Sequence, residues 1–262
     1  MTIIFYTNES RKNMAYNIRY VCCCNTGKIR KNNQDNFFVD WKYLYSENYA
    51  LEVPLSGRHS LADKPAYAVF DGMGGEKHGE IASFISAFTF SQALKSIQGD
   101  PATVLNSACY MMNDAVCKFM TENSIRSMGS TAAILMFDPQ FVTVCNLGDS
   151  GIFKVENGGL LKVSTDHVES NSAFSSKPML TQFVGIPKEE YLIEPSIAIL
   201  NHKAGDKFLI CSDGLTDMVN EADIAAIINT SADIDIAATL LLNEALNRGG
   251  HDNTTIILCE VC

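Results

Sequence analysis

Two spacings of apolar residues divide the chain into predicted helices and strands. Apolar residues of the first helical stretch recur three and four positions apart: Ile81, Phe84, Ile85 and Phe88. The same spacing continues over 101–123, where Asp100 suits the N-cap and Pro101 the first turn. Two further helices are predicted, one at 220–228 with Asn220 as its N-cap and one at 232–247. Successive helices with one apolar face each are expected to pack together on one side of a sheet.

Short apolar runs separated by turn residues predict strands over most of the remaining chain. The predicted strands are 18–24, 37–39, 66–70, 129–137, 141–147, 152–155, 160–163, 191–200, 207–211 and 256–261. Between 129 and 163 the turns are so short that they can join only antiparallel neighbours, which predicts a meander. We therefore expect an α+β fold in which helix pairs cover two packed antiparallel sheets, all within a single domain spanning 1–262.

Three segments fit neither spacing. Residues 1–15 are expected to form a leader, either an extra strand or irregular chain, and 41–64 an inserted loop or hairpin. The stretch 168–177 is polar and serine-rich, which is typical of a surface loop. No internal repeat or Pro/Ser-rich linker suggests a second domain.

Composition narrows the class of protein. With 262 residues, 47% of them hydrophobic, 19% charged and a mean hydropathy of +0.03, the chain is a folded protein and not a disordered one. Its net charge of -10 argues against nucleic acid or an anionic membrane as the main partner. Without a signal sequence or a bilayer-length apolar run, we expect a cytoplasmic monomer.

The nine cysteines are odd in number and scattered through predicted strands and helices. We interpret them as small buried apolar residues in a reducing compartment. Cys259 and Cys262 have the spacing of a metal or redox pair, but no second pair accompanies them.

Five aspartates lie where predicted strands begin or end, most of them beside glycine: Asp35, Asp71, Asp149, Asp213 and Asp252. Each has a plain interpretation, because Asp-Gly is common in turns and Asp71 could simply cap the helix that follows it. Five carboxylates gathered at one edge of two packed sheets would, however, repel one another without cations. Mg²⁺ or Mn²⁺ suits such oxygen ligands, and no Cys/His cluster suggests zinc.

Phosphate chemistry is the use that these residues suggest. Two ions about 3.5–4 Å apart can turn a bridging water into hydroxide and aim it at phosphorus. Arg30, in the basic loop before Asp35, could clamp phosphate oxygens through two parallel hydrogen bonds. A solvated surface arginine is the alternative interpretation.

Seven short motifs follow one another along the chain: Arg30 with Asn33-Gln34-Asp35, Val69-Phe70-Asp71-Gly72-Met73-Gly74-Gly75, Gly129-Ser130-Thr131, Gly148-Asp149-Ser150, Thr165-Asp166-His167, Ser212-Asp213-Gly214-Leu215 and Asp252-Asn253-Thr254-Thr255. In order and placement this series resembles the metal-dependent protein phosphatases of the type 2C (PPM) family, especially its bacterial branch. The resemblance extends from about residue 16 to 261.

The resemblance implies a four-layer α-β-β-α sandwich that hydrolyses phosphoserine and phosphothreonine in proteins, by attack of a hydroxide bridging two of its two or three Mn²⁺ or Mg²⁺ ions. By position, Asp71 would bridge the two central ions and the Gly72 carbonyl would bind one of them. Asp213 and Asp252 would complete the other.

The remaining roles also follow from the resemblance. Asp149, with Asp213, would hold the third ion, and Asp35 would hold metal-bound waters or that ion. Arg30 would bind phosphate. The partners implied are phosphorylated proteins, targets of a Ser/Thr kinase and possibly the kinase itself.

This chain departs from the family pattern at several positions. Met73 stands where animal relatives have a histidine proposed as general acid, so we expect a metal-bound water to deliver the proton, with His78 or His251 as alternatives. Gln34 replaces a glutamate, which leaves that metal more water-bound, and Gly151 replaces an arginine.

Two length changes are expected to alter the substrate-binding rim. The flap, 168–180, is shorter than is usual in the family, and 41–64 is longer than in compact bacterial relatives. We predict that 41–64 partly replaces the flap beside the acids. Two other functions stay open: a catalytically silent module that binds phosphoproteins, and a hydrolase of small phosphomonoesters.

Overall fold

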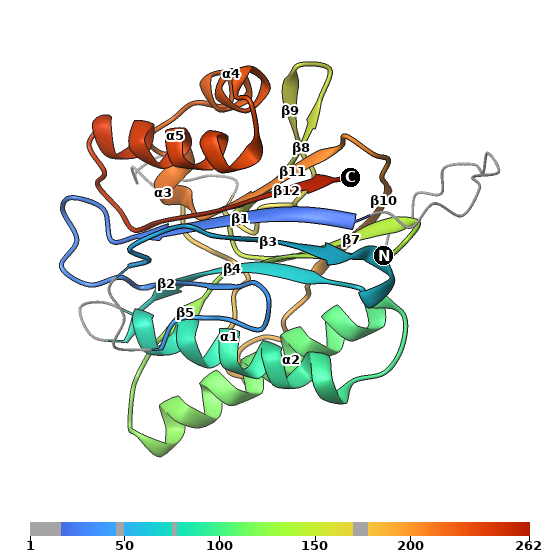
Figure 1. Ribbon diagram of the computed structural model, residues 1–262. Helices are drawn as coiled ribbons and strands as arrows, with labels where there is room; N and C mark the ends of the chain where they lie inside the picture. The colour runs from blue at the N-terminus through green and yellow to red at the C-terminus, as the bar shows by residue number, and fades with distance from the viewer. Residues whose placement is uncertain (1–16, 46–49, 75–77, 170–177) are drawn as a thin grey trace.

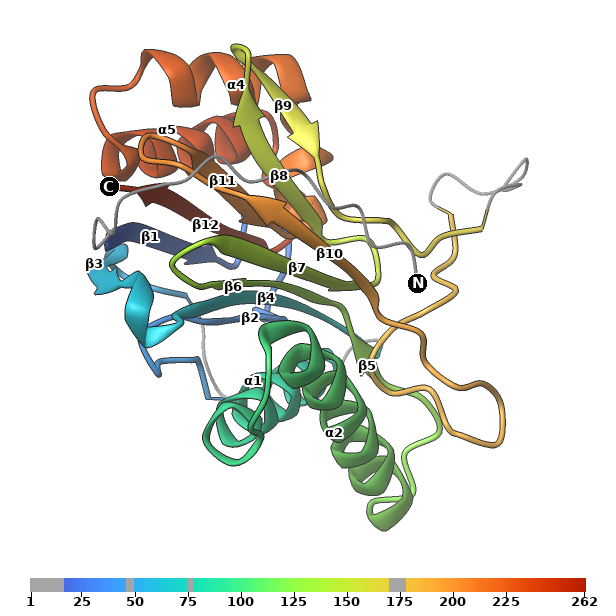
Figure 2. The same ribbon diagram turned by 90° about the vertical axis from the view of Figure 1, so that its right-hand side faces the viewer.

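The computed structural model describes residues 17–45, 50–74, 78–169 and 178–262, which form four layers (Figure 1). The predicted leader therefore lies outside the described residues, as do 46–49 within the insertion and 170–177 within the flap. Two β-sheets form the middle layers and helices cover their outer faces, as Figures 1 and 2 show. The predicted α-β-β-α sandwich is confirmed.

Both sheets are antiparallel. The first has the order β3 (Leu55–Ser60), β1 (Asn17–Asn25), β12 (Thr254–Val261), β11 (Lys207–Cys211), β8 (Gly151–Glu156) and β9 (Gly159–Lys162). The second has the order β10 (Ser196–Asn201), β7 (Phe141–Leu147), β6 (Ala132–Phe137), β4 (Ala66–Met73) and β2 (Asp35–Phe38), and β5 (Gly129–Ser130) pairs with the end of β4.

Helices α1 (Gly79–Ser96) and α2 (Pro101–Glu122) cover the second sheet, and α4 (Glu221–Thr230) and α5 (Ile234–Asn247) cover the first (Figure 2). The predicted caps are present. Asp100 accepts a hydrogen bond from the backbone N–H of Thr103, and Asn220 accepts one from that of Asp223. The short helix α3 (Asp213–Thr216) lies between β11 and α4.

Strand β6 shows how side chains on opposite faces of one strand join two layers. Its side chains pack alternately against the helices (Ala132, Ile134, Met136) and against the other sheet (Ala133, Leu135, Phe137). Successive strand residues point to opposite faces, so a strand buried on both sides must be apolar throughout. Burying one Leu or Phe side chain fully stabilises the fold by about 1.5–3 kcal/mol. A third core lies between the first sheet and α4 and α5.

The predicted meander over 129–163 is wrong in one respect. Strands β6 and β7 form a hairpin in the second sheet, whereas β8 and β9 form a hairpin in the first. The three-residue link Gly148–Ser150 passes from one sheet to the other, and Gly148 has a φ of 100° there. A short turn need not join neighbours in one sheet when two packed sheets approach each other at their ends. The predicted strand at 191–200 begins only at Ser196.

The segment 41–64 does not form a hairpin of its own within the described residues. Its strand β3 is the edge strand beside β1, followed by a short 3-10 helix, η1 (Leu61–Asp63). The backbone N–H of Leu51 donates to the Cys24 carbonyl, close to the end of β1.

Seven of the nine cysteines are buried, Cys117 is half-buried and Cys262 is exposed. Among the helices described, none has the length and apolar character needed to cross a bilayer.

Candidate active site

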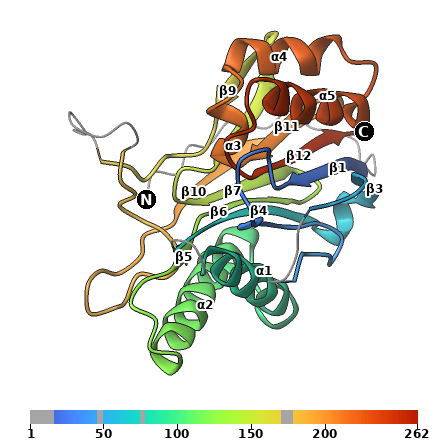
Figure 3. The ribbon, with the colours of Figure 1, turned by 90° about the vertical axis from the view of Figure 1, so that its left-hand side faces the viewer.

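Four of the predicted acids lie at one end of the sandwich, where strands of both sheets begin or end. Asp35 opens β2 and is paired in register with Asp71 of β4. Asp213 follows β11 and Asp252 precedes β12, and these two strands are neighbours in the other sheet. Figure 3 shows the molecule from this side, with the loop between β1 and β2 in blue. The prediction that packed sheets gather these residues at one edge is therefore consistent with the topology.

Asp35 is held across the interface between the sheets. It is buried, and its Oδ2 accepts hydrogen bonds of 2.7 Å from the hydroxyls of both Ser212 and Thr255, which belong to the other sheet. Its Oδ1 is also buried and has no hydrogen-bond partner among the described residues. Burial raises the pKa of Asp35 to about 6, with a contribution from the charge of Asp252, although the two hydroxyls oppose this shift.

Arg30 is not a freely solvated surface arginine. Its Nη2 lies 2.7 Å from Oδ2 of Asp252, and about half of the side chain is exposed. A guanidinium has five N–H donors, so this ion pair leaves most of them for another ligand. The pairing places the predicted phosphate-binding residue beside one of the predicted metal ligands.

Asn253 pins the loop that carries Arg30. Its Nδ2 donates to the carbonyls of Thr26 (2.9 Å) and Asn32 (3.0 Å), and its Oδ1 accepts from the backbone N–H of Gln34 (2.8 Å). Both ends of the loop are thus tied to one buried side chain. Sequence reasoning recognised this asparagine only as part of a motif and did not identify this role.

Asp71 does not cap the following helix. Helix α1 begins at Gly79 with His78 in the N-cap position, and β4 continues past Asp71 to Met73. The backbone of Asp71 is fixed by Thr131 on both sides, because its N–H donates to Thr131 Oγ1 (2.9 Å) and its carbonyl accepts from the Thr131 N–H (2.8 Å). The capping interpretation is therefore wrong.

Gly72 lies where two other segments of the chain come very close to its backbone. A Cβ atom here would come within 2.0 Å of the Gly79 carbonyl oxygen and 2.5 Å of that of Gln34. Only glycine allows this approach, which brings the start of α1 against the end of β4. Met73 pairs with Gly129 of β5 immediately afterwards.

Asp213 lies close to the chain around Asp252, because a second glycine lets two backbone segments touch. It is the first residue of α3 and is mostly buried. At the next position, a Cβ atom on Gly214 would lie 1.9 Å from the Asn253 carbonyl oxygen. The glycine thus lets α3 begin directly against the chain that follows Asp252.

Asp149 lies in the link between the two sheets and is partly exposed. The preceding residue, Gly148, exchanges hydrogen bonds with His167: its N–H donates to Nδ1 (3.2 Å), and its carbonyl accepts from the His167 N–H (3.0 Å). Burial lowers the pKa of His167, whose Nε2 lies 2.9 Å from Ser196 Oγ. The Thr165-Asp166-His167 motif therefore supports this link.

The flap closes on itself at its base. Val168 and Leu180 form an antiparallel bridge, and Glu169 donates its N–H to the Met179 carbonyl. Trp41 and η1 lie at the other end of the sandwich, because β2 runs away from Asp35 and β4 runs towards Asp71. The prediction that 41–64 rims the acids is therefore wrong for these residues.

The donor atoms at this end fit a hard divalent cation. They are carboxylate and carbonyl oxygens, and a buried carboxylate oxygen without a partner, Oδ1 of Asp35, calls for a water or a cation nearby. Within the described part of the chain, no three His, Cys, Asp or Glu side chains form a ready metal-ligating group. Carboxylates repel one another, so drawing them closer needs the charge of a cation.

Comparisons with known proteins indicate the family to which the chain belongs. The family model described as "Protein phosphatase 2C" matches residues 57–247, which is well over half of the chain. The serine/threonine phosphatase stp of Listeria innocua is 26% identical over 254 residues, covering 89% of this chain and 92% of the relative.

Two solved structures share the fold. PppA of Pseudomonas aeruginosa has a TM-score of 0.76 and 23% identity, and covers 94% of this chain and 98% of its own. The catalytic domain of PstP in complex with two manganese ions has a TM-score of 0.74 and 23% identity. The match covers 94% of this chain and 99% of the PstP chain. With the family match over most of its length, the chain belongs to the protein phosphatase 2C (PPM) family of metal-dependent serine/threonine protein phosphatases.

Proposed function

We propose that this protein removes phosphate from phosphoserine and phosphothreonine of other proteins at the end of the sandwich that carries Asp35, Asp71, Asp213 and Asp252. The observation that carries the proposal is the joining of the two sheets at Asp35, whose buried Oδ1 has no hydrogen-bond partner among the described residues, together with the ion pair of the half-exposed Arg30 with Asp252.

The acids divide into two groups by position. Two Mn²⁺ or Mg²⁺ ions would be held by Asp71, the Gly72 carbonyl, Asp213 and Asp252. A third ion or ordered water would be held by Asp149 and Asp35. When bound, such ions supply a water nucleophile of lowered pKa and neutralise charge on the phosphate. The two manganese ions in the PstP structure support a two-ion site.

Arg30 binds and orients the phosphate. Its ion pair with Asp252 fixes one edge of the guanidinium, and the exposed edge presents parallel donors to two phosphate oxygens. A planar donor pair is matched to phosphate, and the tied loop lowers the entropy lost on binding.

Water is the proton source that we infer for the leaving serine or threonine oxygen, because Met73 has no ionisable group. Two histidines lie nearby in the chain. His78 has a buried Nδ1 without a hydrogen-bond partner among the described residues, and His251 is exposed next to Asp252. Removing either histidine is expected to leave most of the activity.

The substrates that we propose are phosphorylated proteins, targets of a Ser/Thr kinase and possibly the kinase itself. The names of the bacterial relatives support this class of substrate.

The test is phosphate release from a phosphothreonine peptide in Mn²⁺, in EDTA, and with the variants Asp71→Ala and Asp213→Asn. We expect EDTA and both variants to abolish turnover. Asp114→Asn, which changes an exposed acid on α2, is the matched control and should keep wild-type activity. Undiminished turnover in Asp71→Ala would refute the assigned site.

Two outcomes in the wild type would point to other functions. Binding of the phosphopeptide without turnover in Mn²⁺ would indicate a silent binding module. Faster turnover of a small aryl phosphate than of any phosphopeptide would indicate a phosphomonoester hydrolase.

A further inference from the structure

A pair of buried hydroxyls, on Thr131 and Ser150, joins the two sheets beside predicted metal ligands. Their Oγ atoms lie 2.6 Å apart, and both residues are buried. Thr131 lies between β5 and β6 of the second sheet, whereas Ser150 is the last residue of the link that enters β8 of the first sheet. The proposed reaction gives neither hydroxyl a role, although each belongs to one of the short sequence motifs.

Thr131 changes the hydrogen-bond ladder at Asp71. Strand β4 pairs with β5 and β6 in one continuous register, in which Asp71 is opposite Thr131. In a regular antiparallel sheet, two opposite residues exchange either two backbone hydrogen bonds or none. Here the carbonyl of Asp71 accepts from the Thr131 N–H (2.8 Å), but the N–H of Asp71 donates to the Thr131 hydroxyl (2.9 Å). The backbone at Asp71 is therefore held partly by a side chain.

The same side chain also contacts both neighbours of Asp149. The Thr131 hydroxyl meets Ser150, and the Thr131 methyl lies against Gly148, where a Cβ atom would come within 2.7 Å of Cγ2. Glycine is required there, both by this contact and by its φ of 100°. Thr131 thus holds the backbone that carries Asp71 and the link that carries Asp149.

The two hydroxyls make separable contributions. A backbone N–H that loses its acceptor inside a sheet is unfavourable, so without the Thr131 hydroxyl the chain at Asp71 would have to shift towards another partner. Without the Ser150 hydroxyl, that acceptor stays in place and only the connection to the link is lost. Thr131 therefore supports both aspartates, and Ser150 supports Asp149 alone.

We propose that Thr131 and Ser150 are positioning residues, which fix the backbone at Asp71 and Asp149 before a cation binds. The inference rests on the proposed function, because it takes these two aspartates as metal ligands. Ligands whose backbone is already fixed lose less conformational freedom when they bind an ion. Residues that orient metal ligands from behind typically contribute about 10- to 100-fold to metal affinity.

Isothermal titration calorimetry of the full chain with MnCl₂ measures ion binding without relying on turnover. Thr131→Val keeps the shape of threonine and removes its hydroxyl, and we expect it to bind every ion about ten-fold more weakly. Thr131→Ser restores the hydroxyl and should regain most of the lost affinity. Ser150→Ala should weaken only the ion that Asp149 is proposed to hold.

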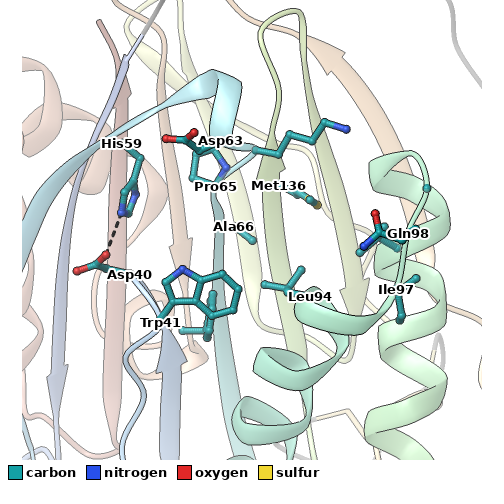
Figure 4. A pocket seen from close by; sticks show the side chains of 14 residues that line it. Asp40, Trp41, His59, Asp63, Pro65, Ala66, Leu94, Ile97, Gln98 and Met136 are labelled. Carbon is teal, nitrogen blue, oxygen red and sulfur yellow. Dashed lines mark hydrogen bonds and ion pairs between the residues drawn. The ribbon is translucent and has the colours of Figure 1, made fainter.

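Tyr67→Phe is the matched control. The Tyr67 hydroxyl is also buried and lies on the same strand, β4, but it meets Nδ1 of His59 (2.9 Å) at the other end of the sandwich, where His59 also pairs with Asp40 (Figure 4). Asp71 lies four residues further along β4, about 13 Å away at about 3.3 Å per residue. Tyr67→Phe should leave the affinity for Mn²⁺ unchanged. Urea unfolding in EDTA shows whether each variant is folded.

Several results would overturn the proposal. One is a folded Thr131→Val that binds Mn²⁺ as tightly as wild type, and another is a Thr131→Ser that binds no better than Thr131→Val. Equal weakening by Tyr67→Phe would also do so, because it would show a general loosening of β4. If Thr131→Val does not fold, unchanged affinity for every ion in Ser150→Ala would decide against the proposal.

The wild type separates this inference from the function on which it rests. Wild type that binds no Mn²⁺ would refute the proposed metal site, and this inference with it. Wild type that binds Mn²⁺, with variants that bind it equally well, would refute the positioning role of the two hydroxyls alone.

Discussion

The hydrogen bonds of Asn253 lead to the sharpest prediction about catalysis. One buried amide, 4% exposed, ties both ends of the loop that carries Arg30. A neutral hydrogen bond contributes about 0.5–1.5 kcal/mol net, so Asn253→Ala should lower the free energy of unfolding by about 2–4 kcal/mol. The loop would also lose its fixed conformation, and with it the orientation of Arg30.

The kinetic effect follows from what Arg30 does. A hydrogen bond to a charged group is worth about 1.5–3 kcal/mol, so kcat/KM for a phosphopeptide should fall roughly ten- to a hundred-fold in Asn253→Ala. Because Asn253 acts through Arg30, its removal should cost much less in an Arg30→Ala background. Steady-state kinetics of the two single variants and the double variant measure this coupling.

Asn113 supplies a matched control. It is also a buried asparagine with three hydrogen bonds to the backbone, accepting from the N–H groups of Gly185 (2.7 Å) and Ile186 (3.0 Å) and donating to the Ile186 carbonyl (2.9 Å). Asn113→Ala should destabilise the protein similarly, measured by urea unfolding, with little change in the affinity for phosphate. If Asn253→Ala loses stability but keeps its kcat/KM, or if its effect simply adds to that of Arg30→Ala, the reasoning is wrong.

Three other predictions concern stability. Gly72→Ala should destabilise the protein by more than about 3 kcal/mol, because its Cβ would lie 2.0 Å from the Gly79 carbonyl oxygen. Gly159→Ala, whose Cβ would have its nearest atom at 3.8 Å, should leave the stability unchanged. Urea unfolding of the two variants compares their free energies of unfolding. Because the pKa of His167 is lowered in the folded state, its stabilising contribution is present above the ordinary pKa of 6.5 and is lost as pH falls through the folded-state pKa. The wild type should therefore lose more stability than His167→Gln between about pH 7.5 and 5.5. Equal losses in the two proteins would contradict the prediction. In EDTA, the raised pKa of Asp35 makes its charged form unfavourable in the folded state, so Asp35→Asn should be more stable than wild type at pH 7.5. Calorimetric scans should show this difference in stability shrinking as pH falls through about 6 towards 3.8. A difference independent of pH would exclude the titration of Asp35 as its cause.

Local spacing determined much of this protein. The apolar run that forms β6 and the helix caps at Asp100 and Asn220 follow from interactions within a few residues, so the sequence predicts them. The positions of the acids at strand ends are likewise visible in the chain, because a strand that stops at Asp-Gly is a local pattern. The family resemblance then supplied their expected roles.

The tertiary structure decided what depends on distant segments. The crossing of Gly148–Ser150 between sheets, the placement of β3 beside β1 and the position of Trp41 away from the acids are set by how the layers pack. The hydroxyls that hold Asp35 lie 177 and 220 positions away along the chain. No periodicity within a window of ten or twenty residues encodes such contacts, since they form only when two sheets, each built from local patterns, bury their apolar faces against each other.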